Sequence, residues 1–481
     1  MLAKLIILMS MALPLFGQAV SGDAAQRAQA ARLAESRNDF PTAVREYEAL
    51  AKLMPHNAEV QSNLGVALYF NHDMTGAAAA SQRAIVLNPN LFAPHLFFGL
   101  AQYHLLGPDR AVPELEKAVR LKGSDVLAHQ WLGYAYVAQL RYDAAVKQFR
   151  SVCGLDPKNV DAWYALGQSY LQLGKNATLK LLASAPDSGR VWQLAGEQYQ
   201  LQGNRQQALE DYLQAIKRRP DVPELSTLIR EAGGTVPAVA SQTRAEWTKE
   251  DAVYRQAHDA EQQAHAAFFE VMRIDPDSYR AHQIMADVFV AKQQPEQAIE
   301  EYRAVLKLKP SLPGVHEAIG NVLEQQGKLD AALKEFEAEI QIQPRSSSAH
   351  VHAGDVLLTM GRDDEATMML TAALGMERPP VEVYRLMGKL DLNRKDARSA
   401  VSNLTRYVAV RKDDSTAYYL LSKAYRELGE KEKMNAALAL FEKTSQDVKA
   451  RSNAQRQLEA VADSRPTPED ASEMKDATMH N

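Results

Sequence analysis

The sequence predicts an all-α solenoid of stacked helical hairpins, and a single period carries this prediction. Prolines recur 34 residues apart, as from Pro55 to Pro89 and from Pro276 to Pro310. Small residues stand ten positions after successive marks of this period, and alanines stand 22 positions after them. The small residues are Gly65, Gly99, Gly133, Gly167, Gly196, Ala286, Gly320, Gly354 and Gly388, and the alanines are Ala77, Ala111, Ala145, Ala208, Ala298, Ala332, Ala366 and Ala400. Three residue classes that keep one phase over most of the chain indicate a repeat protein.

Each period has the composition of two amphipathic helices. Trp163, Leu166, Tyr170 and Leu173 form an apolar stripe at helical spacing. The small residue in the first helix and the alanine in the second let the two helices approach closely. A larger side chain there would cost about 1–3 kcal/mol by overpacking. Because one hairpin cannot bury its apolar face alone, neighbouring hairpins must stack.

Turn signals bound these helices. The proline ends the second helix of a period, because it lacks a backbone N–H and its ring clashes with a preceding carbonyl. Glycines are expected between the first and second helices, where a left-handed residue ends the first one. These glycines are Gly174, Gly203, Gly327, Gly361 and Gly429.

This pattern resembles the tetratricopeptide repeat family, whose period is 34 residues and whose consensus is W-x2-L-G-x2-Y, followed by alanine, an aromatic residue and proline. The fullest copy is Trp163, Leu166, Gly167 and Tyr170. The match covers about residues 24 to 448. The resemblance implies a right-handed α-solenoid of helix-turn-helix repeats that binds other proteins or peptide segments.

Breaks in the period divide the chain into blocks. Residues 24–222 form an N-terminal block of repeats, and residues 245–448 form a C-terminal block. Between them, residues 223–244 are expected to be an irregular insertion or hinge, because two glycines followed by a proline are typical of a loop. The unit at 160–188 is five residues shorter than the others, so its second helix should be stunted. Residues 449–481 carry mixed charges and no aromatic residue, and we expect a largely disordered tail with room for a capping helix to about Val461.

The first residues have the layout of a secretory signal peptide. One positive charge precedes an apolar stretch of 12 residues from Leu5 to Phe16, and small residues allow cleavage of residues 1–19, or cleavage as late as Gly22. The stretch is shorter than the roughly 20 residues that a spanning helix needs. No cysteine follows it to carry a lipid. We therefore expect a periplasmic or secreted protein with no membrane span after cleavage, and a retained anchor is the alternative.

Composition excludes several classes of function. The net charge of −5 provides no basic field for nucleic acid. Cys153 is the only cysteine, which excludes an intramolecular disulfide and a cysteine-based metal site. We expect it to be a small apolar core residue.

No catalytic constellation emerges from the motifs. Gly320 and Gly327 precede a lysine, but their spacing is wrong for a phosphate-binding loop and their places in the repeat explain them. The histidine pairs His258 with His265 and His350 with His352 are expected to lie on the surface or in turns rather than to bind metal. We expect no catalytic residue, no cofactor and no metal.

In the family that the sequence resembles, positions 2, 5, 9 and 12 of each first helix line a concave groove for peptides. In the N-terminal block these positions are apolar and rich in tyrosine, which buries area at low entropic cost and keeps a hydrogen-bonding tip. Further along they become acidic, and in the last units mixed and basic. The candidate peptide-binding residues are Tyr69, Leu96, Leu100, Tyr103, Gln130, Tyr134, Tyr164, Gln168, Glu197, Arg385, Lys389 and Tyr419. The alternative is that the apolar ones pack against neighbouring units and the charged ones form a solvated face.

The sequence as a whole predicts a non-enzymatic scaffold or adaptor, exported to the cell envelope, that binds polypeptide segments. Two alternatives stay open. One is a regulatory or substrate-recruiting subunit of an envelope enzyme or export complex. The other is a structural scaffold that associates with itself.

Overall fold

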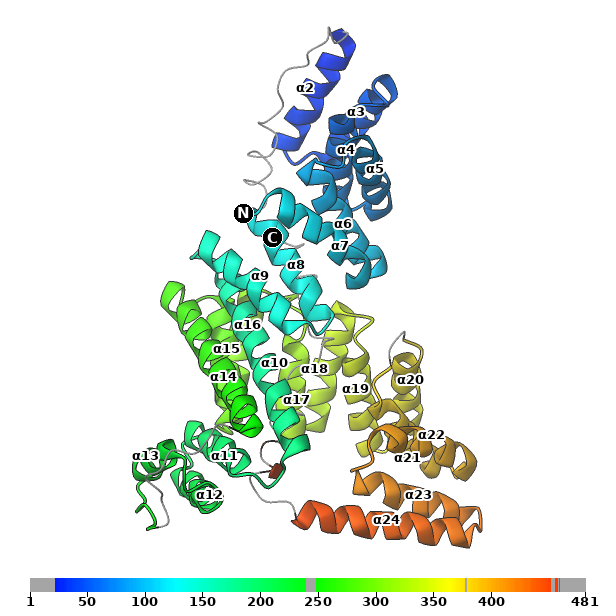
Figure 1. Cartoon of the computed structure of the whole chain (residues 1–481). Coiled ribbons are helices and arrows are strands. Elements are labelled where there is room, and N and C mark those ends of the chain that lie inside the picture. Colours follow the sequence, from blue (N-terminus) through cyan, green and yellow to red (C-terminus); the bar gives the residue numbers. More distant parts are fainter. Residues whose placement is uncertain (1–21, 239–247, 377–378, 451–454, 457, 459–481) are drawn as a thin grey trace. The chain divides into compact units, whose positions relative to one another are not determined.

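Helices make up all the regular secondary structure in the part of the chain that the computed structural model describes, residues 22–238, 248–376, 379–450, 455, 456 and 458. Most of the helices follow one another along the chain as antiparallel pairs (Figure 1). The predicted all-α solenoid of helical hairpins is confirmed. The predicted signal peptide at residues 1–19 lies outside the described residues.

The described residues divide into two compact units. The first holds residues 22–172 together with Ala264–Glu270, and the second holds Leu173–Gln263 together with the residues from Val271 onward. The border falls inside two long helices, α10 (Val160–Ser184) and α14 (Lys249–Ile274). The boundaries of the two units therefore differ from those of the predicted repeat blocks, 24–222 and 245–448.

Four hairpins precede α10 in the first unit. They are α2 (Gly22–Ser36) with α3 (Phe40–Leu53), α4 (Ala58–Phe70) with α5 (Met74–Leu87), α6 (Phe92–Leu106) with α7 (Pro108–Leu121), and α8 (Val126–Ala138) with α9 (Tyr142–Leu155). Short polar residues cap several of these helices. The Asn57 side chain, for example, accepts hydrogen bonds from the amides of Glu59 and Val60 and so satisfies two free donors of α4.

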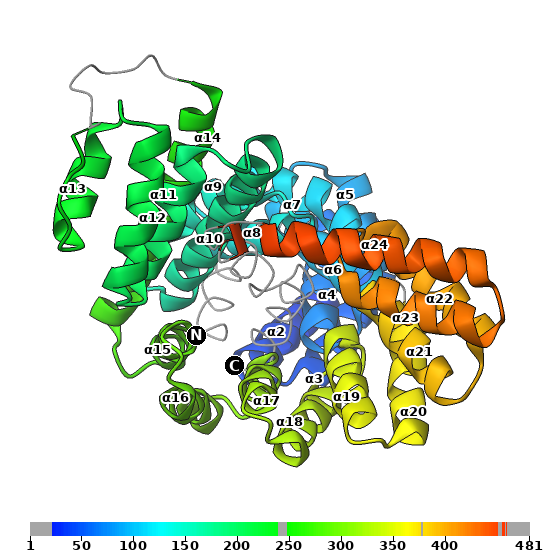
Figure 2. The same ribbon diagram turned by 90° about the horizontal axis from the view of Figure 1, so that it is seen from below.

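The second unit begins with the rest of α10 and a short group of helices, α11 (Gly189–Leu201), α12 (Arg205–Arg218) and α13 (Pro223–Glu231). After α14 the array continues with α15 (Tyr279–Ala291), α16 (Pro295–Leu308), α17 (Val315–Gln325), α18 (Leu329–Ile342), α19 (Ser347–Thr359), α20 (Asp363–Leu374), α21 (Glu382–Asn393), α22 (Ala397–Val410), α23 (Ser415–Glu427) and α24 (Lys431–Ala450). Figure 2 shows α17, α19 and α21 on the inner side of this array and α18, α20 and α22 on its outer side. The first helices of successive hairpins therefore share one face.

Four of the five predicted turn glycines are confirmed. Gly203, Gly327, Gly361 and Gly429 have φ between 72° and 79°, the left-handed region that ends a first helix. The expected turn at Gly174 is wrong, because this residue lies inside α10, a continuous helix of 25 residues. Gly174 instead packs against α14, where an added Cβ would make an ordinary van der Waals contact, 3.4 Å from the carbonyl oxygen of Ala257. The unit at 160–188 thus has no stunted second helix.

The first half of α10 takes its partner helix from α14, within the first unit. A Cβ added at Gly167 would lie 2.4 Å from the ring of Phe268. The same contact joins Gly133 to Phe149 at 2.8 Å, within a complete hairpin. Gly133 and Phe149 are 16 residues apart, whereas Gly167 and Phe268 are 101 residues apart. One hairpin is therefore split, and a segment of 85 additional residues is inserted between its two helices.

The inserted segment contains the predicted hinge. Residues 223–231 of the expected irregular stretch form the helix α13, with Leu225 and Ile229 fully buried in a cluster that includes Tyr212. Gly233 then takes a φ of 87° after the helix ends, as expected for a loop that contains two glycines. Residues 239–247 lie outside the described part of the chain.

Part of the predicted tail packs in the second unit. Leu458 is buried in the cluster that contains Leu181 and Trp192, and the side-chain amide of Gln455 donates to the carbonyl of Pro186. The tail from residue 459 to 481 lies outside the described residues.

In several hairpins, a ring N–H of a histidine or tryptophan side chain donates a hydrogen bond to the backbone of the preceding hairpin. The donors stand at the fourth position of a first helix, and the acceptors are carbonyls at the end of the preceding hairpin. The pairs are His95 Nε2 with Pro89 O at 2.9 Å, His129 Nε2 with Gly123 O at 3.0 Å, and Trp163 Nε1 with Pro157 O at 3.0 Å. At this position the histidine ring therefore makes the same hydrogen bond as the tryptophan ring.

The same histidines also bind the second helix of their own hairpin. Their Nδ1 atoms lie 2.6 or 2.7 Å from a side-chain oxygen 19 residues further along, and two histidines of later hairpins make the same contact. The pairs are His95 with Glu114, His129 with Gln148, His282 with Glu301 and His316 with Glu335. These histidines are structural, and the fixed spacing of 19 residues is the sequence signal that identifies them.

The split hairpin makes a testable prediction at Phe268. The Phe268→Ala variant should remove the ring that faces Gly167, and because this side chain is half-buried the cost should be below the roughly 3–5 kcal/mol of a fully buried phenylalanine. Hydrogen exchange of the α10 amides between Val160 and Gln172 should become faster. Phe269→Ala is the matched control, because its side chain is 65% exposed on the same helix. Unchanged exchange in the Phe268→Ala variant would contradict the assignment of α14 as the missing helix.

Candidate functional site

The apolar part of the predicted groove is buried in the first unit. Six candidate residues are at most 8% exposed: Tyr69, Leu96, Leu100, Tyr103, Tyr134 and Tyr164. A peptide partner cannot contact side chains that the protein itself covers. The prediction that they form an exposed binding track is corrected, and they are core residues.

Aromatic packing is the physical reason for this burial. Each of the four tyrosines lies against an aromatic ring of another helix. The pairs, with the distance between ring centroids, are Tyr69 with Phe97 at 5.3 Å, Tyr103 with Trp131 at 5.5 Å, Tyr134 with Phe149 at 5.3 Å, and Tyr164 with Phe268 at 5.9 Å. Contacts at these distances stabilise an aromatic pair beyond its buried area. The alternative reading, that the apolar positions pack against neighbouring helices, applies to this unit.

The two candidate glutamines of the first unit are half-buried next to these tyrosines. The side-chain amide of Gln130 donates to the hydroxyl of Tyr134, and the amide of Gln168 donates to the hydroxyl of Tyr164, both at 3.0 Å. The partners are four residues apart on one helix, which places them on the same face. The glutamines therefore cover polar tips of the core.

Glu197 lies in a polar network between α11 and α14 in the second unit. Its carboxylate accepts from the hydroxyl of Tyr254 at 2.7 Å and lies 3.2 Å from Nδ1 of His258. The hydrogen bond with Glu197 raises the pKa of His258 above its ordinary value. Gln193 donates to the same Tyr254 hydroxyl at 2.7 Å. The predicted role of Glu197 on an open groove is corrected, because α14 occupies this face of α11.

An ion pair anchors the start of α14 in the same network. Asp251 is 1% exposed and lies 2.6 Å from Nε of Arg190 and 3.2 Å from Nη2 of Arg219. Burial alone would raise the pKa of Asp251. Hydrogen bonds from Thr248, Arg190 and Arg219 outweigh that effect and hold the pKa well below its usual range. The inserted segment therefore depends on an ionised, fully paired carboxylate.

Asp251 makes the stability of this segment depend on pH. A carboxyl group with a lowered pKa contributes stability above its unfolded pKa of about 4, and loses it as the pH falls towards the folded value. The Asp251→Asn variant should be less stable than the wild type at neutral pH by about 3 kcal/mol, as expected for a broken buried pair. The difference should shrink below about pH 4. Urea unfolding, monitored by hydrogen exchange of the α11 and α14 amides, measures the loss of stability at neutral pH and its decrease at low pH.

Asp187→Asn is the control for this experiment. Asp187 pairs with Arg218 at 2.9 Å on the same segment, but its side chain is 73% exposed. Exposed ion pairs contribute little, so this variant should retain the wild-type stability at both pH values. An equal loss in the two variants would show that the Asp251 network has no special role.

The last candidate residues remain on the surface of the second unit. The side chains of Arg385 and Lys389 on α21 are 25% and 35% exposed, and Tyr419 on α23 is 46% exposed. Their helices are first helices of successive hairpins, on the inner side of the array (Figure 2). Asp355 on the preceding first helix, α19, lies 3.7 Å from Arg385 and 3.9 Å from Lys389. These residues form a charged and accessible surface, the inner face of α17–α23.

Carboxylates form the other end of this inner face. Glu324 on α17 is half-buried, and burial together with the nearby charge of Asp355 raises its pKa to about 7. His352 Nδ1 lies 3.8 Å from Glu324, and its Nε2 lies 3.7 Å from Glu317. Burial lowers the pKa of His352, so the ring is neutral at pH 7 and does not compensate these charges.

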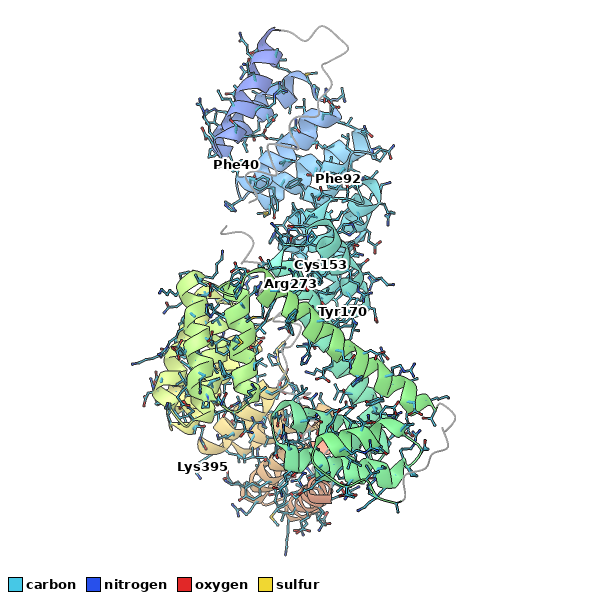
Figure 3. The ribbon with its side chains drawn as sticks, turned by 90° about the vertical axis from the view of Figure 1, so that its left-hand side faces the viewer. Phe40, Phe92, Cys153, Tyr170, Arg273 and Lys395 are labelled. Atoms are coloured by element: carbon cyan, nitrogen blue, oxygen red, sulfur yellow. The ribbon has the colours of Figure 1, made fainter. Side chains whose placement is uncertain are left out.

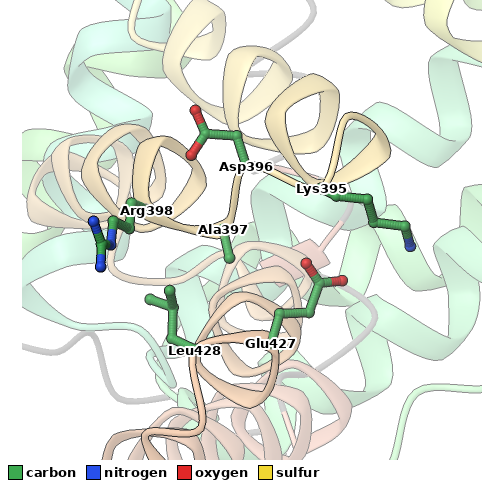
Figure 4. Close-up of a pocket in the computed structure, with 6 residues that line it drawn as sticks. All are labelled: Lys395, Asp396, Ala397, Arg398, Glu427 and Leu428. Carbon is green, nitrogen blue, oxygen red and sulfur yellow. The ribbon is translucent and has the colours of Figure 1, made fainter.

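A shallow depression lies at the turn between α21 and α22 (Figure 4). Its lining residues are Lys395, Asp396, Ala397, Arg398, Glu427 and Leu428. Asp396 serves as the N-cap of α22 and accepts from the amide of Ser399 at 3.1 Å. Helix capping accounts for Asp396, and the other charged residues of the depression are those of an exposed turn. The depression therefore has no features of a ligand-binding site.

The other potentially reactive side chains, Cys153 and His350, are buried and have a structural role. Cys153 on α9 is 5% exposed, and burial raises the pKa of its thiol to about 12, so it is not a nucleophile (Figure 3). Its prediction as a core residue is confirmed.

His350 is also buried, and its Nδ1 lies 2.7 Å from the carbonyl of Ser346, so its expected place on the surface is wrong. In the described residues no three histidine, cysteine or acidic side chains come together as metal ligands. None of the described helices combines the length and the apolar character that crossing a bilayer requires.

Family profiles match several parts of the sequence. A profile described as TPR repeat matches residues 136–174 and 286–327. Two profiles described as tetratricopeptide repeat match residues 28–91 with 317–367, and residues 189–222. No curated protein matches the chain.

Solved structures of repeat proteins are similar to this chain. A thermophilic TPR protein of Thermus thermophilus has 15% identity and a TM-score of 0.34, over 56% of this chain and 100% of that chain. YrrB, described as a TPR protein with an unusual peptide-binding site, has 22% identity and a TM-score of 0.28, over 43% of this chain and 92% of that chain. The Cut9–Hcn1 hetero-tetramer of the APC/C has 13% identity and a TM-score of 0.35, over 92% of this chain and 96% of that chain.

Proposed function

Because the chain is a tetratricopeptide repeat protein, we propose that it is a non-enzymatic scaffold that binds other polypeptides on the inner face of α17–α23. The observation that carries this proposal is the exposure of Arg385, Lys389 and Tyr419 on successive first helices. The corresponding apolar positions of the first unit are buried, so they offer a partner no comparable surface.

The residue types on this face suit protein recognition. Arginine and tyrosine are enriched in interfaces, because they combine a large contact area with directional hydrogen bonding. Tyr419 also packs against Phe441 of α24, with ring centroids 5.7 Å apart, which holds its ring in place. A side chain that is fixed before binding loses less entropy when a partner arrives.

We further propose that this scaffold acts in the cell envelope or outside the cell. The support is the sequence of residues 1–19, with one positive charge, a short apolar stretch and the small residues Gly17 and Ala19 at the −3 and −1 positions of the cleavage site. The array would then be a periplasmic or secreted adaptor for other proteins.

Site-specific photo-crosslinking in intact cells tests the binding face. A photoreactive amino acid at Lys389 or Tyr419 should capture the same partner protein. Met368 on α20 is the control position, because it is 62% exposed on an outer helix and should capture little of that partner. A Lys389→Glu change should weaken the capture at Tyr419 by about tenfold, because it reverses a charge on the face that the partner contacts.

The crosslinking experiment distinguishes the inner face from other binding surfaces. Equal capture at Met368 and Tyr419, or no capture at either inner position, would contradict the inner face as the binding surface. Capture of a second copy of this chain alone would favour the self-associating scaffold.

A further inference from the structure

The charges of the inner face of α17–α23 are ordered along the array. Glu324 and Asp355 lie on α17 and α19, and Arg385 and Lys389 lie on α21. Lys423 on α23 continues the basic series. Helices of one array hold these side chains in a fixed sequence, with negative charge first and positive charge after it.

The acidic end carries negative charge that the face compensates only in part. Asp355 is the only one of the two carboxylates with cationic partners in the described residues, and those contacts of 3.7 and 3.9 Å are longer than a direct hydrogen bond. Among the described residues, the neutral His352 is the one basic side chain within ion-pair distance of Glu324. Burial and the charge of Asp355 raise the pKa of Glu324 to about 7, so this carboxyl group is about half ionised at pH 7 and becomes fully charged above that pH.

The basic end carries uncompensated positive charge. Neither Lys423 nor Arg426 forms an ion pair within the described part of the chain. Lys423 Nζ lies 5.9 Å from the centroid of the Tyr419 ring, a cation–π contact that leaves the ammonium group able to bind an anion. The two ends of one face therefore have opposite charge, which is partly compensated at the acidic end and, among the described side chains, without an ion pair at Lys423 and Arg426.

We propose that this face binds a polypeptide segment that carries a block of basic residues next to a block of acidic residues. Either block can come first in the sequence of the segment. The basic block lies on Glu324 and Asp355, and the acidic block lies on Lys389, Lys423 and Arg426. This inference rests on the proposed function and names the chemistry of the partner. A segment of one charge sign meets repulsion at one end of the face, so the order of charges sets the specificity.

Two synthetic peptides of identical composition test the inference with the full-length chain. One carries a block of lysines and then a block of glutamates, and the other carries the same residues in alternation. Fluorescence anisotropy at low ionic strength should show that the block peptide binds at least about tenfold more tightly. The preference should decline at about 1 M salt, where the Debye length falls to about 3 Å.

Charge-reversal variants locate the effect on the inner face. Glu324→Lys and Lys423→Glu should each remove most of the preference for the block peptide. Glu337→Lys is the control, because Glu337 is exposed on the outer helix α18 and should leave the preference unchanged. Circular dichroism of each variant shows that the helices remain folded.

The outcomes separate this inference from the proposed function. Equal binding of the two peptides, no binding of either, or an unchanged preference in the Glu324→Lys variant would overturn the ordered-charge inference. Partner capture at Lys389 and Tyr419 would still stand in those cases. Loss of that capture would overturn the proposed binding face itself.

Discussion

The close approach of two helices within each hairpin is the constraint on which the rest of the structure depends. A residue without a side chain in the first helix faces a large side chain of the second. A Cβ at Gly320 would lie 2.5 Å from the ring of Phe336, and a Cβ at Gly354 would lie 2.6 Å from Leu370. Since real Cβ atoms do not approach so closely, a substitution would push the helices apart. Each hairpin buries its apolar face on its neighbours, so the displacement would spread along the stack.

The same constraint explains how the chain accommodates an insertion inside one hairpin. The contact is between two helices, and it does not require them to be joined by a short turn. Phe268 meets Gly167 in the same way as Phe149 meets Gly133, although the chain between the first pair is far longer. The inserted segment has its own supports, the Asp251 ion pairs and the packing of Gly174 against Ala257. Its stability therefore rests on contacts that the repeat consensus does not contain.

The repeat and its helices could be predicted from the sequence, because stacking requires the same small, apolar and turn residues in every unit. The split hairpin could not, since a period identifies helices but not which two of them pair. The signal was present all the same: Ala264, Phe268 and Pro276 keep the spacing of a second helix that has no first helix before it. The tyrosines of the first unit were misplaced for another reason. The burial of Tyr103 depends on Trp131 of the next hairpin, and a groove position assigned from a family pattern carries no information about that neighbour.

Arg385, Lys389 and Tyr419 stay partly exposed, unlike the tyrosines of the first unit, and physical chemistry explains the difference. Moving an unpaired charge from water into a protein core costs far more than moving a tyrosine ring, so charged groove positions stay hydrated. The ion pairs of Asp355 with Arg385 and Lys389 are long and partly exposed, and such pairs contribute little to stability. A partner that replaces them therefore loses little free energy at that step. Because the charges stand on packed helices, their order is fixed before a partner arrives, so a matching partner binds at a low entropic cost and a partner with another order of charges meets repulsion.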